Sequence, residues 1–364
     1  MNKIFLLHLF VFFHTFSVFS QTSDSTKLNI IESQFSDSIA LINEQNEYLR
    51  SSRDAYNSGL LFLEDKNYID AIIYFTNAIK IDSTFSEAYL SRAKCYEVSD
   101  YELASADYLK LFDLDSSDLS PLYLLAALQF QSDIELAKQT YNNIIFINNY
   151  EYMAFSKLGI IAFLAKDYKQ AEQLFSQSLD INTNVYALND RGSCYRKLDQ
   201  FDDAIKDYLA AIALNADLAF IYSNLASLYA KKGDTDKALD YYNFAIKKDA
   251  NYALAYNNKA SLLIENKEYE KASSSIEKAL VSNPEYAPAF NNRGVLNHQY
   301  KKFNDAINDF NKAIQLDDNY AKAYLNRGIS KQMIRDEDGA CLDWNKAKKL
   351  GIMLAKKYLS NDCE

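Results

Sequence analysis

Three stretches near the C-terminal end decide the fold: AYNNKAS at residues 255–261, AFNNRGV at residues 289–295 and AYLNRGI at residues 323–329. They follow one another at a constant interval, beginning at Ala255, Ala289 and Ala323. One alanine keeps this phase along the chain at nearly equal intervals, at Ala71, Ala104, Ala137, Ala171, Ala204, Ala238, Ala272, Ala306 and Ala340. A period of about 34 residues is the signature of a repeat array, so nine similar units are predicted between residues 52 and 350.

Each unit has the pattern of two packed helices. A large residue follows the recurring alanine by four positions, and a mostly small one follows three positions later, which is the spacing of one helix face. Another small residue precedes the alanine by eleven or twelve positions, and in five units it is glycine: Gly59, Gly159, Gly192, Gly294 and Gly328. Glycine at one fixed phase predicts close contact between two helices, and hence an all-α fold.

The composition excludes several enzyme classes. The chain has 8 glycines and no G-x-G pair, so it can form neither a Rossmann fingerprint nor a P-loop. His8 and His14 lie in an N-terminal apolar stretch, which leaves His298 alone outside it, so zinc sites and Ser-His-Asp triads are not expected. No catalytic residue, metal site or cofactor is therefore predicted. The formal net charge of −10 disfavours nucleic acid and anionic membranes as partners.

The phased units resemble the tetratricopeptide repeat. The resemblance covers about residues 52 to 350; it is tightest in the fifth to ninth units and loosest in the third, where Pro121 heads the first helix. Drift of the repeat explains the third unit best, with a hinge or ligand notch as the alternative. The resemblance implies antiparallel helix pairs, A and then B, that stack into a right-handed superhelical solenoid with a concave groove lined by the A helices. It implies much less about function.

An asparagine row is the sharpest candidate for a binding site. Asn224, Asn258, Asn292 and Asn326 stand two residues before the small A-helix position, each exactly one period after the last, and Asn57 of the first unit has the same phase. In the family this position lies on the concave face, where side-chain amides can pair with the C=O and N–H groups of an extended peptide. The alternative is that these residues bridge neighbouring A helices by hydrogen bonds.

Two further features of the A helices bear on ligand binding. Some family members clamp a C-terminal carboxylate with Lys, Asn and Arg, and units seven to nine supply Asn258, Asn292 and Lys322; Asn326 stands where the Arg would be, so the clamp is incomplete. Lys322 is a secondary groove candidate together with Asn57. A basic column, Arg191, Lys259, Arg293 and Arg327, could read acidic side chains of a ligand, but such residues more often cover apolar surface or pair with acids.

Residues 1–20 are predicted to be a secretory signal peptide. Lys3 precedes an apolar stretch from Ile4 to Phe19, and Val18 and Ser20 suit cleavage after Ser20. An uncleaved membrane anchor is the alternative, because the stretch approaches the shortest length that spans a bilayer. The mature protein is therefore expected to be exported, either periplasmic or secreted, with membrane contact if the segment is retained.

Two helical segments are expected to flank the repeats. Residues 21–51 are predicted to form a cap, from Ile31, Phe35, Ile39, Ile42 and Leu49 at near-helical spacing, with a docking helix or short coiled coil as the alternative. Residues 351–364 are predicted to form a C-terminal capping helix and tail. Cys341 falls on the last B helix and Cys363 just beyond this cap, so the two could form a disulfide in an oxidising compartment. The closing unit GACLDWNKAKKLG, with a cysteine shortly after, also resembles those of bacterial family members.

The function expected from these observations is a non-catalytic, exported interaction scaffold that binds a protein or extended peptide in the concave groove. An enzyme would need a clustered nucleophile and base or a set of metal ligands, and nothing of that kind stands out among the 49 acidic residues. The alternative is an N-terminally anchored envelope assembly or sensor component that uses the same repeats.

Overall fold

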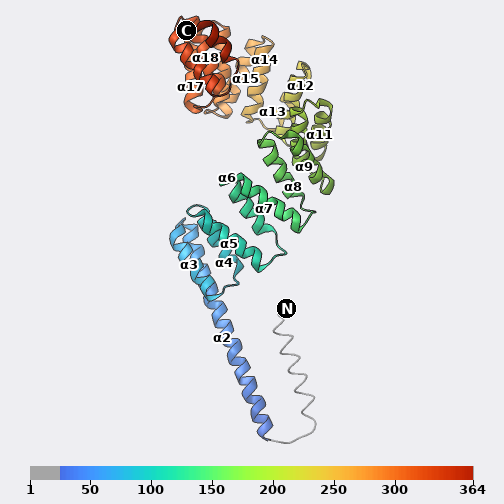
Figure 1. The fold of residues 1–364 in the computed structure, drawn as a ribbon, viewed down its shortest axis with the longest axis vertical. Helices are drawn as coiled ribbons and strands as arrows, with labels where there is room; N and C mark the ends of the chain where they lie inside the picture. Colours follow the sequence, from blue (N-terminus) through green and yellow to red (C-terminus); the bar gives the residue numbers. More distant parts are fainter. Residues whose placement is uncertain (1–24, 364) are drawn as a thin grey trace. The chain divides into compact units, whose positions relative to one another are not determined.

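The computed structural model describes residues 25–363, and every regular element in this range is a helix, α2 to α20 (Figure 1). Nine antiparallel pairs occupy the nine predicted units, which confirms the all-α solenoid. The pairs are α2 (Ser25–Glu64) with α3 (Tyr68–Ile81), α4 (Ser86–Tyr96) with α5 (Tyr101–Leu114), α6 (Ser120–Ser132) with α7 (Ile134–Ile147), α8 (Tyr152–Leu164) with α9 (Tyr168–Ile181), α10 (Val185–Lys197) with α11 (Phe201–Leu214), α12 (Ala219–Lys231) with α13 (Thr235–Lys248), α14 (Ala253–Glu265) with α15 (Tyr269–Ser282), α16 (Ala287–Gln299) with α17 (Phe303–Leu316), and α18 (Ala321–Met333) with α19 (Glu337–Lys349). A last helix, α20 (Ala355–Asp362), follows them.

The helices belong to two compact bodies, which divide between Thr140 and Tyr141. The division falls inside α7, in the third repeat, which is the unit that departs most from the sequence pattern. Pro121 lies in the first turn of α6, where its missing N–H leaves no helical hydrogen bond unmade. Within each body, a B helix packs against its own A helix and against the A helix that follows.

The phased columns of the sequence form the core of the repeats. All nine recurring alanines are buried, and so are the large residues four positions later, which include Phe310 and Trp344. The glycines bring the two helices of a pair together. A Cβ atom on Gly294 would lie 2.6 Å from Cε1 of Phe310, and one on Gly328 would lie 2.5 Å from Nε1 of Trp344. The predicted role of glycine as a helix-contact residue is therefore confirmed.

Tight turns join the A and B helices. A residue just after the A helix has a positive φ in seven repeats, as Gly233 in one and as Lys66, Lys166, Asp199, Lys267, Lys301 and Arg335 in the others. This left-handed residue lets the following N–H close a six-residue turn, as when Asp234 N donates to Tyr229 O. The next side chain often caps the B helix, as Asp234 does by accepting from the N–H of Lys237.

The two flanking segments behave differently. The N-terminal segment continues into the first A helix without a break, because α2 runs from Ser25 to Glu64. Phe35, Ile39 and Leu49 are exposed on it, so residues 32–50 do not pack as the expected cap. At the other end α20 packs on α19: Ala355 is buried, and the ring of Tyr358 stacks on Trp344 with centroids 5.0 Å apart.

The expected signal peptide, residues 1–20 with its cleavage site after Ser20, lies outside the described residues. Among the helices from Ser25 onward, none combines the length and the apolar character that a membrane span requires.

Candidate functional site

The asparagine row occupies equivalent positions on α12, α14, α16 and α18, and all four side chains are half-buried. Three of them bridge to the preceding A helix. Nδ2 of Asn224 donates to Oδ1 of Asn189 at 2.8 Å, Nδ2 of Asn292 donates to Oδ1 of Asn257 at 2.8 Å, and Nδ2 of Asn326 donates to Oδ1 of Asn291 at 3.0 Å. The row therefore ties successive A helices together, which is the role that the sequence left open beside ligand binding.

Asn258 differs from the other three. The residue that would receive its bridge is Ser223 rather than asparagine, and the side chain of Asn258 makes no hydrogen bond to any residue between 25 and 363. Because an amide offers two N–H donors and two acceptor lone pairs, Asn258 keeps its full capacity for a ligand. The row thus contains three bridging amides and one that is uncommitted.

The bridges have buried acceptors that sequence reasoning did not single out. These acceptors are Asn189, Asn257 and Asn291, and all three are buried. Each directly precedes the residue that occupies the position of the asparagine row on its own helix, which is Asp190, Asn258 or Asn292. The signal was present in the doublets Asn257-Asn258 and Asn291-Asn292, in which the first residue accepts from the next repeat. The constant offset between donor and acceptor, one position more than the repeat period, would have identified the pairs.

A carboxylate takes the row position in the fifth repeat. Oδ1 of Asp190 accepts from Nδ2 of Asn189 at 3.0 Å, so that Asn224, Asn189 and Asp190 form a continuous chain of hydrogen bonds. Burial raises the pKa of Asp190, against the lowering effects of the Asn189 hydrogen bond and the charge of Lys157. When ionised, Asp190 can only accept hydrogen bonds, so this end of the row differs chemically from the amide positions.

The basic column serves the fold. Arg191 donates two hydrogen bonds of 2.8 Å to Asp207, and Arg327 donates two of 2.8 and 2.5 Å to Asp343, each pair joining the A and B helices of one repeat. Arg293 and Arg92 contact Asp309 and Asp107 likewise. Lys259 is the exception: Ser275 stands at the acid position, and Nζ of Lys259 donates instead to Oδ1 of Asn243 at 2.7 Å. Most of the column is thus engaged by acids and does not present free charge.

An apolar row lies one helical turn before the amide row. It consists of Met153, Tyr186, Phe220 and Leu254, which recur at the second position of the A helices α8, α10, α12 and α14; Phe220 is half-buried and the other three are exposed. The rings of Tyr186 and Phe220 are stacked, with centroids 6.3 Å apart and planes 9° apart. Sequence reasoning missed this row, although its intervals match the repeat. Amides and apolar side chains therefore share one face of the A helices.

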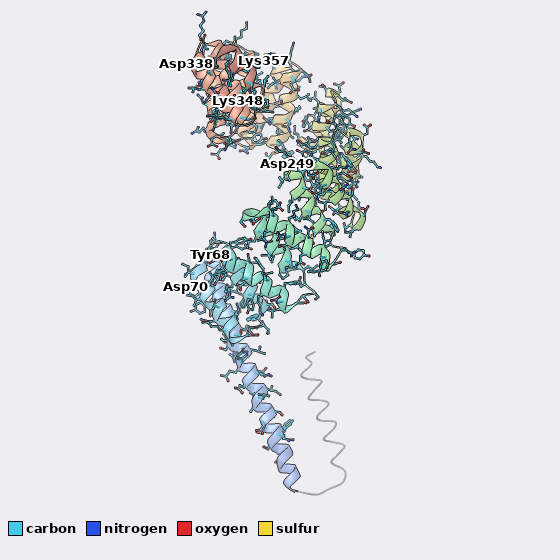
Figure 2. All side chains as sticks on the ribbon, in the orientation of Figure 1. Tyr68, Asp70, Asp249, Asp338, Lys348 and Lys357 are labelled. Atoms are coloured by element: carbon cyan, nitrogen blue, oxygen red, sulfur yellow. A yellow bond between two sulfur atoms is a disulfide. The ribbon has the colours of Figure 1, made fainter. Side chains whose placement is uncertain are left out.

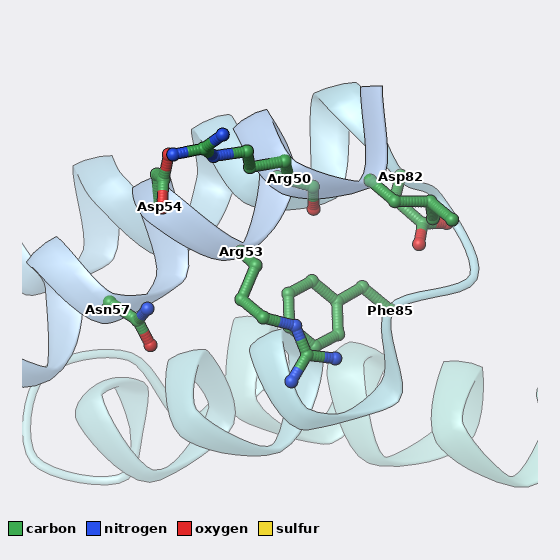
Figure 3. A pocket seen from close by; sticks show the side chains of 8 residues that line it. Arg50, Arg53, Asp54, Asn57, Asp82 and Phe85 are labelled. Atoms are coloured by element: carbon green, nitrogen blue, oxygen red, sulfur yellow. The ribbon is translucent and has the colours of Figure 1, made fainter. Parts of the chain in front are cut away.

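The secondary candidates fall in separate places. Lys322 is exposed on α18, one turn before Asn326, and Asn326 lines a small cavity of about 170 Å³ with His298. Nδ1 of His298 lies 2.9 Å from Oγ of Ser330, and burial lowers its pKa. Asn57 belongs to the first body, where it lines an open cavity of about 430 Å³ with Arg50, Arg53 and Phe85 (Figure 3). The guanidinium of Arg53 lies over the Phe85 ring, 5.6 Å from its centroid.

The cysteines are of two kinds. Cys341 of α19 and Cys363, which follows α20, form a disulfide with their Cα atoms 5.8 Å apart, so the last helix is tied covalently to the ninth repeat. Cys95 and Cys194 are free and buried, and burial raises the pKa of the Cys194 thiol to about 12. Within the described residues no group of three His, Cys, Asp or Glu side chains could hold a metal ion.

Comparison with known proteins identifies the repeats directly. Family models described as "TPR repeat" and "Tetratricopeptide repeat" match residues 192–233, 223–287 and 287–320. None of these models describes a catalytic domain.

Curated relatives match over shorter parts. Human "Tetratricopeptide repeat protein 6" is 26% identical over 161 residues, which cover 43% of this chain and 31% of that protein. Human "DnaJ homolog subfamily C member 7" is 40% identical over 73 residues, which cover 20% of this chain and 14% of that protein. The matched part of this chain thus spans a third or less of the length of these relatives.

Two solved structures align over most of the chain. A chain of the APC/C hetero-tetramer Cut9–Hcn1 superposes with a TM-score of 0.57 at 14% identity, over 86% of this chain and 76% of that one. Yeast Tom70 gives a TM-score of 0.45 at 15% identity, over 85% of this chain and 94% of that one. At this identity the first likeness concerns the fold alone. The repeat models assign tetratricopeptide repeats to residues 192–320, and the helix pairs with their phased core repeat the same pattern in the rest of the described chain.

Proposed function

We propose that this chain is an exported, non-catalytic scaffold that holds an extended segment of a partner protein along the A helices of the fifth to eighth repeats. The observation that carries the proposal is the presence of two rows on one face: the amides of Asn224, Asn258 and Asn292, and the apolar row to which Tyr186 and Leu254 belong. Amides suit the backbone of such a ligand, and apolar side chains suit its residues.

The spacing of the A helices fits an extended ligand. Packed helices lie about 8–10 Å apart, and an extended chain advances about 3.3 Å per residue, so every third ligand residue would meet the next A helix. The bridges between Asn292 and Asn257 and between Asn224 and Asn189 hold the row in place before binding. A row that is already ordered reduces the entropy lost when the ligand binds.

Export is supported by two features. The N-terminal sequence has the pattern of a signal peptide, and the Cys341–Cys363 disulfide suits an oxidising compartment. Intact-mass measurement of the protein from its native host tests this part. We expect a chain that begins at Gln21; a chain that retains residues 1–20 would favour the anchored alternative, an envelope assembly or sensor component that uses the same repeats.

Recovery of partners from the native envelope fraction tests the binding face. The test variant is Asn258→Ala, because this amide makes no bridge within residues 25–363 and its loss leaves the neighbouring A helices joined. One lost hydrogen bond of about 1 kcal/mol lowers the affinity about fivefold. Lys278→Ala, on the B helix α15, is the matched control. Equal recovery with Asn258→Ala and the native chain would remove Asn258 from the proposed site.

A further inference from the structure

The first half of α2 is a helix that the other helices of the first body leave exposed. From Ser52 onward α2 packs in the first repeat, where Oγ of Ser52 donates to Ala78 O and Tyr56, Leu60 and Leu63 pack against Phe75. Between residues 32 and 48, the side chains of α2 stand clear of α3, α4 and α5 (Figure 2). A single helix in water is marginally stable, since most helical stability in proteins comes from packing of an apolar face.

The uncovered half carries a heptad seam. One column repeats at every seventh residue as Leu28, Phe35, Ile42, Leu49, Tyr56 and Leu63, and every member is apolar or aromatic. Tyr56 and Leu63 use this column to pack in the core of the first repeat. Phe35 and Leu49 continue the same column with 59% and 53% of their surface exposed. The packing face of the first repeat thus extends beyond the elements that could bury it.

The second column of the seam indicates what covers it. It lies four residues after the first, at Glu32, Ile39, Asn46 and Arg53, so that the first column holds d positions and the second, more polar column holds a positions of a coiled coil. In a parallel two-stranded coiled coil, equivalent a residues meet across the axis. Two copies of Asn46 can then hydrogen-bond to each other, because each amide both donates and accepts. A single asparagine at an a position is the feature that selects two strands and fixes their register.

The charges of α2 suit a second copy of the same helix. The positions that flank the seam are mostly uncharged, with Ser36, Ser38, Asn43 and Gln45, and the acids Asp37, Glu44 and Glu47 fall on the outer positions. Two copies therefore meet without like charges along most of the seam. A different partner with a basic helix would need acidic residues beside the seam to attract it, and α2 does not place its acids there. Glu32 lies in the seam itself, at the first a position, so its two copies face each other at the N-terminal end and oppose association there, whereas Arg50 flanks the seam.

We infer that two copies of this chain associate through residues 32–50 of α2 as a parallel coiled coil. Burying Phe35, Ile39, Ile42 and Leu49 from both copies hides roughly 800 Å² at most, and the flanking polar side chains add to this area, which places the contact at the low end for a specific interface, so weak association in the micromolar range is expected. The dimer would present two repeat arrays from one stalk. The inference rests on α2 and is independent of the proposed binding face on α10 to α16.

Molar mass in solution tests the dimer. We expect the purified chain to sediment as a dimer at about 100 µM and to dissociate on dilution through the micromolar range. Phe35→Lys and Ile42→Lys place a charge in the seam of both copies, and each should raise the dissociation constant of the dimer about a hundredfold. Leu41→Lys is the matched control, because Leu41 is 60% exposed on the same helix but lies off the seam. Circular dichroism should show the repeats unchanged in all three variants.

Cysteine cross-linking tests the parallel register. Glu32→Cys and Asn46→Cys each place a thiol at an a position, so each variant alone should form a disulfide dimer under mild oxidation. The native free thiols of Cys95 and Cys194 do not compete, since both are buried. A monomer at the highest concentration would overturn the inference, as would dissociation by Leu41→Lys. Cross-linking only in a mixture of the two variants would indicate antiparallel helices and would overturn the parallel arrangement.

Discussion

Asn292 donates its side-chain amide to both Oδ1 and O of Asn257, at 2.8 and 3.2 Å, and thereby joins the A helices of the seventh and eighth repeats. This bond makes the proposed ligand row part of the stacking interface. Asn257 is buried, so its side chain depends on the next repeat for a partner. Binding face and repeat stacking are therefore supported by the same side chains.

The Asn292 bridge should contribute measurably to stability. Asn292→Ala removes the donor and leaves the Oδ1 of buried Asn257 without it, so the free energy of unfolding should fall by about 1–2 kcal/mol. Asn258→Ala, at the same position one repeat earlier, should change it by less than about 0.5 kcal/mol. Urea denaturation of the two variants checks the difference. Equal losses would show that the bridge does not act as described.

The ion pair between Arg191 and Asp207 can be compared with repeats of this same chain that lack it. Asp207 is buried, so Arg191→Leu should cost about 3 kcal/mol by leaving a carboxylate without its partner. Replacing both residues by Leu should recover most of the loss, because Leu158 and Leu174 occupy these positions in the fourth repeat. A double-mutant cycle measures the coupling. A double variant as unstable as Arg191→Leu would contradict the explanation.

The close contact between Gly294 and Phe310 predicts that adding a methyl group at residue 294 lowers the stability by an amount that depends on the side chain at residue 310. Gly294→Ala places Cβ 2.6 Å from the ring and should destabilise the chain by about 1–3 kcal/mol. Phe310→Ile should relieve much of this loss, because Ala260 and Ile276 occupy these positions in the seventh repeat. Thermal unfolding of the single and double variants provides the test, and additive losses would argue against the contact.

The left-handed turn residue Lys301 should be improved by glycine. Its φ is 60°, a conformation that costs about 1 kcal/mol for a residue with a Cβ atom. Lys301→Gly should therefore raise the stability by up to about 1 kcal/mol, although the greater freedom of glycine in the unfolded chain reduces the gain. Lys312→Gly, at an exposed position inside α17, is the control and should destabilise the chain by about 1 kcal/mol. A loss of stability in Lys301→Gly would contradict the strain argument.

The repeat and its core followed from the sequence because a fixed period places residues such as Ala306 and Phe310 on one helix face. The bridge from Asn292 to Asn257 did not, because it depends on the offset between two A helices, which periodicity alone does not give. The Arg–Asp pairs could have been found, since Asp207 and Asp343 follow their arginines at one fixed spacing along the chain. The continuity of α2 was not predicted, because the repeat period marks where the first unit begins and does not tell whether the preceding segment joins its first helix; Ser52, at this boundary, is buried and donates to Ala78 O.

Site-specific photo-cross-linking tests the central claim most directly, namely that a partner segment lies along the A helices. A cross-linking residue would replace Tyr186, which is 61% exposed on α10, or Leu254 on α14; Val281, 83% exposed at the end of the B helix α15, provides the control. In the native envelope we predict the same partner adducts at Tyr186 and Leu254, weakened by Asn258→Ala, and none at Val281. Adducts at Val281 alone, or equal adducts at all three positions, would contradict the proposed function.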